Sequence, residues 1–154
     1  MEQCGGYGEL YTFQMINILD FKDKYSEYHH QFIVDERVKK GFQLCSGDYN
    51  PLHNDDSFAK RKGFNQCVMY GNVLNCFVSY FIGELLPTQE VIIHSQEIAY
   101  RQPVYLGDTL DFIANVSEVF DMVNTVDFSF VFRNGDGKIV AKGKIQIGLI
   151  PDVQ

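Results

Sequence analysis

The chain has 154 residues, of which 45% are hydrophobic and 21% are charged, and its net charge is −7. These values fit one globular domain with a single sizeable core, and the acidic balance argues against a general binder of nucleic acid or anionic membranes. No apolar run reaches the ~20 residues that span a bilayer, and the N-terminus lacks the basic and apolar regions of a signal peptide. We therefore expect a cytoplasmic protein.

The four cysteines, Cys4, Cys45, Cys67 and Cys76, have neither C-x-x-C spacing nor the spacing of zinc ligands. We expect reduced thiols and no metal site, with Cys67 and Cys76 as small core residues among apolar neighbours. This pattern gives little support to catalysis by a cysteine nucleophile.

The N-terminal part of the chain predicts an extension followed by a strand and a helix. Residues 1–24 mix glycines with a short apolar run and are assigned to an extension of uncertain structure, so the domain is expected over residues 25–154. Residues 25–34 are rich in aromatic and β-branched side chains, which is typical of a strand. Asp35 is a suitable N-cap for a helix through Ser46, and Gly47 is expected to end that helix.

Asp48 and His53 follow this helix, separated by four residues. Gly47 and Pro51 disfavour regular structure, which predicts a bent loop. A carboxylate and an imidazole on a constrained loop form a candidate acid–base pair. Two structural roles remain open: Asp48 as a turn-forming or helix-capping residue, and His53 as a buried, hydrogen-bonded histidine. Asn50 and Pro51 fit loop architecture better than chemistry.

Residues 55–62 predict a short helix, with acidic and capping residues at its start, basic residues at its end and Gly63 as a stop. The basic run consists of Lys60, Arg61 and Lys62. This run is either a solvated helix end or a local patch that faces the phosphates of a ligand.

Residues 71–86 form the longest apolar segment, which Pro87 ends. Its apolar residues recur at helical spacings of four, three and four, at Leu74, Val78, Phe81 and Leu85. The segment is apolar on most sides, which predicts a buried central helix. Its polar exceptions, Asn75 and Ser79, then need hydrogen-bond partners.

The remaining residues predict an antiparallel meander. Four runs have β-branched or aromatic enrichment, at residues 90–101, 109–120, 125–133 and 138–147. Residues 134–137, Asn-Gly-Asp-Gly, are typical of a hairpin turn between the last two. The order of elements favours an α+β domain in which a long curled sheet wraps around one helix.

The motif around the candidate pair resembles the signature of a known family. The string Phe42-x-x-Cys45-Ser46-Gly47-Asp48-x-Asn50-Pro51-Leu52-His53 looks like that of the MaoC-like (R)-specific enoyl-CoA hydratases. Gly71, Ser79 eight residues later, and the Pro-Val-x-x-Gly-Asp turn at residues 103–108 also match the family pattern. The resemblance implies a hot-dog fold, usually paired as a homodimer, that acts on thioesters of coenzyme A or acyl carrier protein without a metal or redox cofactor.

The resemblance also implies roles for individual residues in the reversible hydration of trans-2-enoyl thioesters to (R)-3-hydroxyacyl thioesters. Asp48 and His53 would activate water and shuttle its proton, the Gly71 N–H would hold the thioester oxygen, and Ser79 would hydrogen-bond Asp48. This chain has Tyr70 where family members commonly carry histidine. The candidates for substrate binding are Asn50, Lys60, Arg61, Lys62, Tyr70 and Arg101.

The chemistry of these residue types agrees with hydration. A positioned acid–base pair is typically worth about 10²–10⁴-fold in rate, and an N–H at a helix start can stabilise developing enolate charge. Two alternatives stay open: a hot-dog acyl thioesterase, and a non-catalytic subunit that binds acyl thioesters. The carrier, the acyl chain length and the order of proton transfers stay open as well.

Overall fold

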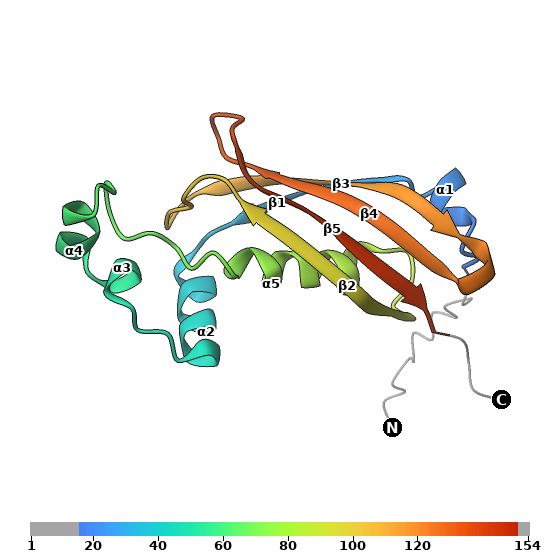
Figure 1. The fold of residues 1–154 in the computed structure, drawn as a ribbon, viewed down its shortest axis with the longest axis horizontal. Helices are drawn as coiled ribbons and strands as arrows, with labels where there is room; N and C mark the ends of the chain where they lie inside the picture. The colour runs from blue at the N-terminus through green and yellow to red at the C-terminus, as the bar shows by residue number, and fades with distance from the viewer. Residues whose placement is uncertain (1–15, 151–154) are drawn as a thin grey trace, which may run out of the picture.

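The computed structural model describes residues 16–150, so the predictions for residues 1–15, including Cys4, lie outside it. Figure 1 shows a curved sheet with one long helix lying along it. The elements in chain order are α1 (Asp20–Asp23), β1 (Glu27–Ile33), α2 (Glu36–Ser46), α3 (Pro51–Asn54), α4 (Asp56–Arg61), α5 (Val73–Tyr80), η1 (Phe81–Leu85), β2 (Val91–Tyr100), β3 (Thr109–Phe120), η2 (Asp121–Val123), β4 (Thr125–Arg133) and β5 (Ile139–Leu149).

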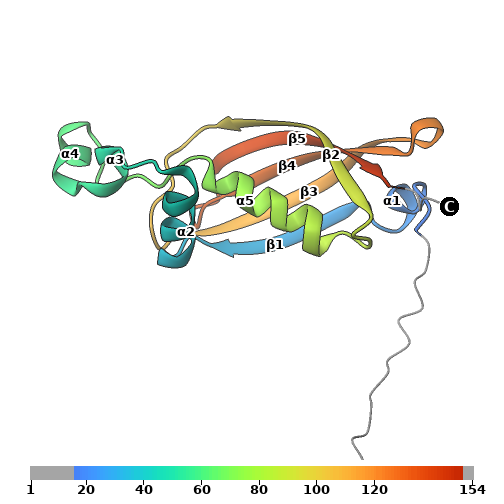
Figure 2. The same ribbon diagram turned by 90° about the horizontal axis from the view of Figure 1, so that it is seen from below.

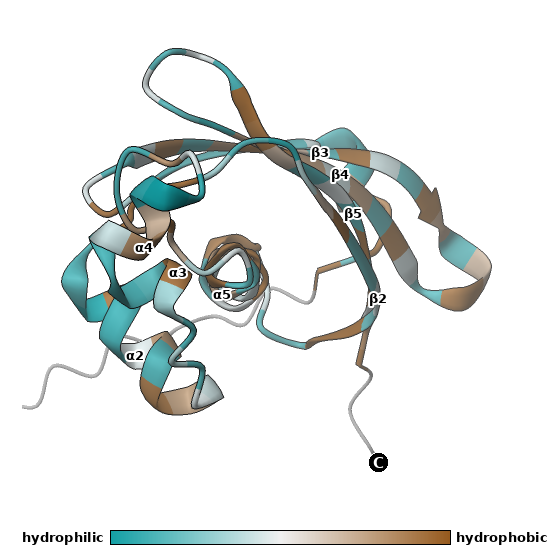
Figure 3. Ribbon diagram, turned by 60° about the vertical axis from the view of Figure 1, so that its left-hand side comes forward, coloured by the Kyte–Doolittle hydropathy of each residue, from teal (hydrophilic) through white to brown (hydrophobic). Residues whose placement is uncertain are grey.

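The sheet has five antiparallel strands in the order β1-β3-β4-β5-β2, which lie behind α5 in Figure 2, and it curls around α5, as the view along the helix in Figure 3 shows. All the predicted strands are present within a few residues of their expected ends. The α+β prediction of an antiparallel sheet around one helix is confirmed. No helix within residues 16–150 has the length and apolarity needed to cross a membrane.

Strand β4 shows why the sheet has one buried face. Its side chains alternate, and those that face α5 are buried: Val126, Phe128, Phe130 and Phe132. Phe112 of β3 packs against this row, 4.9 Å from Phe132 between ring centroids. Burying a phenylalanine side chain is worth roughly 1.5–3 kcal/mol, so this aromatic layer contributes strongly to the core.

Helix α5 covers that layer, but it is not buried on all sides. Leu74, Val78 and Phe81 of the predicted stripe are buried. Cys76 is exposed on the opposite side, so the prediction that it is a core residue is wrong. A single helix on a single sheet leaves its outer side uncovered, and nothing within residues 16–150 buries that side.

Residues ahead of the predicted start of the domain at residue 25 also contribute to the core. Ile18 and Phe21 are buried, and the Phe21 ring packs edge-on against Phe128 at 6.0 Å. The boundary predicted at residue 25 therefore leaves out two residues that contribute to the core.

Residues 48–70, named here the projecting segment, extend beyond the start of α5 (Figures 1 and 2). The bent loop predicted across His53 is wrong in part, because α3 forms one helical turn there. Asn50 caps this turn by accepting the Leu52 N–H at 2.9 Å, and Pro51 occupies the first helical position, where it needs no N–H partner. The short helix predicted over residues 55–62 is confirmed as α4. Asp55 caps its start by accepting the Phe58 N–H at 3.0 Å.

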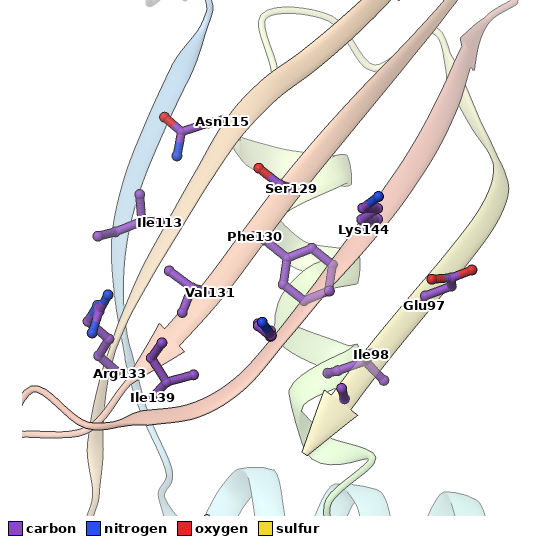
Figure 4. Close-up of a pocket in the computed structure, with 13 residues that line it drawn as sticks. Glu97, Ile98, Ile113, Asn115, Ser129, Phe130, Val131, Arg133, Ile139 and Lys144 are labelled. Atoms are coloured by element: carbon purple, nitrogen blue, oxygen red, sulfur yellow. The ribbon is translucent and has the colours of Figure 1, made fainter. Parts of the chain in front are cut away.

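A groove of about 550 Å³ lies on the face of the sheet opposite α5 (Figure 4). It mixes apolar side chains such as Val131 and Ile139 with the cationic Arg133 and Lys144. None of the residues that the sequence singles out for the site lines this groove.

Candidate active site

Asp48 and His53 come together at the base of the projecting segment. Gly47 ends α2 with a left-handed backbone (φ 67°), which turns the chain so that Asp48 follows directly. His53 lies in the single turn of α3, and its Nε2 is 4.0 Å from Oδ2 of Asp48. The histidine side chain is 15% exposed and the carboxylate 43% exposed, so the pair lines a surface that solvent reaches.

The backbone selects the tautomer of His53. Its Nδ1 lies 2.7 Å from the carbonyl oxygen of Val68. Because a carbonyl only accepts, Nδ1 must carry the hydrogen, and Nε2 of the neutral ring is left as an acceptor on the side of Asp48. This is the arrangement that a general base needs.

The carboxylate of Asp48 is oriented by its own turn. Oδ1 accepts the Asn50 N–H at 2.9 Å, while the Asp48 N–H donates to Oγ of Ser46 at 3.2 Å. Oδ2 therefore stays available on the side of His53. The turn-forming role of Asp48 and the hydrogen-bonded role of His53 both occur here, and they orient the pair rather than compete with it.

Tyr70 lies beneath both members of the pair and is 3% exposed. Its hydroxyl donates to the backbone oxygen of Asp48 at 2.9 Å, and its ring centroid is 4.2 Å from that of His53. The structure thus places this substrate-binding candidate against the catalytic candidates themselves.

Two adjoining cavities meet at this point. One of about 290 Å³ contains Asp48, and one of about 340 Å³ extends away from it. Both are lined by His53, Tyr70, Gly71 and Tyr100. The two cavities therefore adjoin at the candidate pair, and each lies near the lower end of the usual size range of a small-molecule site.

Gly71 forms part of the wall that the two cavities share, two residues before the start of α5. Among residues 16–150, its backbone N–H has no hydrogen-bond acceptor, so this donor is available to a ligand. A Cβ added at this position would lie 3.4 Å from the Tyr100 ring, so a larger residue at position 71 would crowd Tyr100. The helix itself begins at Val73 rather than at Gly71 as predicted, because residues 71 and 72 form a turn.

The larger cavity is mainly apolar. Its walls include Phe64, Val68, Met69, Leu74, Pro103 and Val104. Arg101 also lines it, so the structure brings one of the two predicted basic groups to the site. An apolar cavity with a cation on its wall suits a chain with an anionic end.

Other predicted site residues lie apart from the pair. Ser79 is exposed on α5, lines neither cavity and makes no hydrogen bond to Asp48 in the part of the chain described. Asn50 acts as the cap of α3, as loop architecture predicts. The basic run at the end of α4 is exposed, with Arg61 and Lys62 lying 5.6 and 5.4 Å from the Phe58 ring centroid.

A polar network that the sequence did not single out borders the site. The Tyr100 hydroxyl donates to Oδ1 of Asn72 at 2.8 Å, and Nε2 of Gln96 donates to Oδ1 of Asn75 at 2.6 Å. Partial burial raises the pKa of the Tyr100 phenol, which therefore stays a donor at neutral pH. These residues come from β2 and the start of α5, and only the three-dimensional fold brings them together. The network supplies the partner that Asn75 was expected to need.

Within residues 16–150, no three His, Cys, Asp or Glu side chains cluster as a metal site. The three cysteines in this range are free. The expectation that the reaction uses no metal stays a prediction.

Comparisons with known proteins give consistent relatives. A family profile described as MaoC like domain matches residues 24–130. The chain is 34% identical over 67 residues to the (R)-specific enoyl-CoA hydratase of Aeromonas caviae, covering 44% of this chain and 50% of that protein. It is 32% identical over 79 residues to the 3-hydroxybutyryl-CoA dehydratase of Methylorubrum extorquens, covering 51% and 50%. The chain thus spans about half the length of these two curated relatives.

Solved structures agree on the fold. R-hydratase PhaJ1 from Pseudomonas aeruginosa superimposes with a TM-score of 0.74 at 28% identity, covering 82% of this chain and 81% of that one. The (R)-hydratase from A. caviae also gives 0.74, at 22% identity, covering 80% and 93%. The ChsH1–ChsH2 complex from Mycobacterium tuberculosis gives 0.69 at 18% identity, covering 79% and 93%, and like the A. caviae structure it supports the fold alone.

Proposed function

Since this chain belongs to the MaoC-like domain family and has its hot-dog fold, we propose that it is a hydro-lyase that reversibly hydrates trans-2-enoyl thioesters to (R)-3-hydroxyacyl thioesters. One observation carries the proposal: the proton-accepting Nε2 of His53 faces the Asp48 carboxylate beside the Gly71 N–H, which has no acceptor within residues 16–150. The names of the curated relatives, a hydratase and a dehydratase, support the same reaction class.

The separation within the pair suits a bound water. At 4.0 Å, Nε2 and Oδ2 are too far apart for a direct hydrogen bond, but a water between them can contact both. The water oxygen would bond to the β-carbon of the enoyl group while the pair takes one of its protons. A proton returned to the α-carbon then completes the addition of one water.

Gly71 would stabilise the charge that this addition creates. Attack at the β-carbon moves the C=C electron pair toward the thioester, whose oxygen becomes negative. An N–H directed at that oxygen stabilises it, and removal of one such donor elsewhere costs roughly 10²–10³ in rate. Because the Gly71 N–H has no acceptor in the described chain, it needs no rearrangement for this role.

The apolar cavity would take the acyl chain, and Arg101 on its wall would face a phosphate of coenzyme A or phosphopantetheine. This carrier is the substrate, and the proposed reaction needs no further cofactor. The exposed run of Lys60, Arg61 and Lys62 is proposed as a second contact with these phosphates, because it concentrates positive charge in a chain that is acidic overall.

The remaining proposals concern the assembly. We propose a homodimer located in the cytoplasm. The exposed side of α5, which carries Ser79, supports pairing because residues 16–150 of one chain leave it uncovered. Ser79 would act on Asp48 only if a second copy brought the two together.

Turnover of crotonyl-CoA tests the proposed reaction. The purified protein should remove the absorbance of the conjugated enoyl thioester, and Asp48→Asn and His53→Asn should each lower this rate about 10²–10⁴-fold. Asp136→Asn in the hairpin turn and His29→Asn on β1 make the same chemical changes at exposed positions and should leave the rate unchanged. Equal rates for wild type and the two site variants would refute the assigned roles.

Two other outcomes would favour the alternatives. Release of free thiol without a hydrated product, followed with a thiol-reactive dye, would indicate a thioesterase. Binding of crotonyl-CoA with no turnover would indicate a non-catalytic subunit.

A further inference from the structure

Tyr70 contacts both members of the candidate pair, although neither is its neighbour in sequence. We propose that Tyr70 is a positioning residue: its hydroxyl holds the backbone of Asp48 and its ring holds the imidazole of His53, so that Tyr70 sets the distance between carboxylate and imidazole. This inference rests on the proposed hydratase function.

The Tyr70 hydroxyl has no proton left for a substrate. Its single hydrogen is donated to the Asp48 carbonyl oxygen at 2.9 Å, and the oxygen accepts Nδ2 of Asn54 at 3.3 Å. Asn54 is held in turn, because its Oδ1 accepts Nε2 of Gln43 from α2 at 2.9 Å. The hydroxyl is therefore part of a chain of bonds from α2 through α3 to the start of α5, which points to a positioning role.

The Tyr70 ring fixes the plane of His53 from one side. The two ring centroids are 4.2 Å apart with an interplanar angle of 38°. The centroid of the Tyr70 ring also lies 5.1 Å from that of Phe42. Because Tyr70 is only 3% exposed, its ring has little freedom to move. With Nδ1 of His53 bonded to Val68, the imidazole is held both at its edge and across its face.

The position of Tyr70 in the chain explains why this matters for the pair. Asp48 and Tyr70 are the two ends of the projecting segment, 22 residues apart, and the hydroxyl joins them at its base. The Val68 N–H also donates to the Leu52 oxygen at 3.1 Å, which ties the inner part of the same base. If the base opens, Asp48 moves relative to His53, and such misplacement of reacting groups lowers the rate.

Histidine, which family members commonly carry here, has a shorter side chain without a terminal hydroxyl. It offers a ring for stacking on His53 but less reach toward the Asp48 carbonyl. The tyrosine therefore adds a link to the carboxylate side of the pair.

Two variants separate the hydroxyl from the ring. Tyr70→Phe removes only the hydroxyl, and we expect kcat for crotonyl-CoA to fall about tenfold with KM unchanged, since a lost hydrogen bond of ordinary strength corresponds to about this factor. Tyr70→Leu also removes the stacked ring and should lower kcat further. Tyr28→Phe is the matched control, because the Tyr28 hydroxyl lies in the core away from the site, and its rate should equal that of wild type.

The kinetic pattern decides between roles. A rise in KM with unchanged kcat would make Tyr70 a substrate-binding residue and overturn the proposal. A lower Tm with unchanged kcat per folded molecule would make its role purely structural and also overturn it. In an Asp48→Asn background the Tyr70→Phe effect should largely disappear, because a residue that acts through Asp48 has nothing left to position.

A measurement independent of activity separates this inference from the proposed function. NMR signals of the Asp48 carboxylate carbon and the His53 ring should shift in Tyr70→Phe and stay in place in Tyr28→Phe. Unchanged signals in Tyr70→Phe would overturn the positioning role, whether or not the protein hydrates crotonyl-CoA. Shifted signals in a protein without turnover would support the positioning role while the hydratase function fails.

Discussion

His53 and Asp48 are each held by a local contact before any substrate binds. Val68 selects the tautomer of the histidine, and the N–H of Asn50 orients the carboxylate. Each contact uses one polar atom of the side chain and leaves the other for chemistry. A preorganised pair of this kind does not have to rearrange in the transition state.

A prediction at the scale of single residues concerns Tyr28, whose hydroxyl is buried without a hydrogen-bond partner in the described chain. The centroid of its ring lies 5.2 Å from that of Phe81, so the ring contributes to core packing. Only the buried hydroxyl, which has no partner within residues 16–150, lowers the stability of the fold. Tyr28→Phe keeps the ring, and it should raise the free energy of unfolding in urea by about 1 kcal/mol. Tyr100→Phe is the contrasting variant: it loses the bond to Asn72 and should lower stability.

The pH dependence of the free energy of unfolding, compared between wild type and Tyr28→Phe, gives a second check. Burial raises the pKa of the Tyr28 phenol above its ordinary value of 10.0. The contribution of the neutral phenol is complete below pH 10.0 and is lost as the pH rises toward the folded-state pKa. The stability advantage of Tyr28→Phe over wild type should therefore grow above pH 10. A constant difference across that range would contradict a buried, unpaired phenol.

The sequence predicted the pair itself but not the contacts that hold it. The spacing and the family resemblance were enough to single out Asp48 and His53. The Val68 carbonyl is a backbone group that every residue possesses, so no residue type marks it. The Tyr70 contacts join positions 16 to 22 residues apart through side chains, and local patterns do not encode such distances.

Among the elements, the projecting segment combines correct and incorrect predictions. Its capping residue Asp55 was predicted well, as was Asp35 at the start of α2 outside the segment, because a cap depends on neighbours within three residues. The turn of α3 was missed because Pro51 was interpreted as a helix breaker, whereas at the first helical position it favours a helix.

Asp56 ties the far part of this segment and leads to a prediction of its own. Its Oδ1 accepts the Cys67 N–H at 2.7 Å, and hydrogen bonds from the thiol and the backbone of Cys67 lower the pKa of this carboxyl. A lowered folded-state pKa stabilises the fold above the ordinary value of 3.8, and that contribution is lost as the pH falls through the folded-state value.

Asp56→Asn imitates the protonated carboxyl and should therefore increase hydrogen exchange of residues 56–67 at pH 7. The difference from wild type should begin to shrink below pH 3.8 and vanish once the pH has fallen through the lowered folded-state pKa, where Asp56 itself becomes protonated. Asp136→Asn in the exposed hairpin turn serves as the control and should leave exchange in this segment unchanged. Faster exchange in Asp56→Asn that persists at low pH would show that charge is not the cause.

At the scale of the whole molecule, the alternation in β4 and the helical stripe of α5 were sufficient to predict a sheet around one helix. The strand order was not available from these patterns, because the pairs between β1 and β3 join residues 76 to 88 positions apart in the sequence. Nor did the sequence indicate that one side of α5 stays exposed. That side carries apolar and small residues, which made the helix look fully buried, and only the single layer of the sheet shows otherwise.

The edge of the sheet leads to the last prediction, which tests the proposed homodimer. Strand β2 is at one edge, and its Ile92 is 54% exposed, whereas the exposed residues of edge strand β1 are mostly polar. An edge with unpaired backbone groups and exposed apolar side chains favours pairing with a second copy about a two-fold axis. Light scattering should therefore give twice the mass of one chain.

Ile92→Lys should shift this mass toward the monomer, because a lysine at a self-paired edge brings like charges together. Ile33→Lys introduces the same charge at an exposed isoleucine of β1, the opposite edge of the sheet, and should leave the dimer intact. Ile92 is already exposed in the single chain, so its replacement should not unfold the domain. A monomeric wild type, or an Ile92→Lys protein that keeps the full dimer mass, would contradict pairing through β2. If the crotonyl-CoA rate falls together with the dimer mass, the second copy contributes to the site, and Ser79 on the exposed side of α5 becomes the first residue to replace.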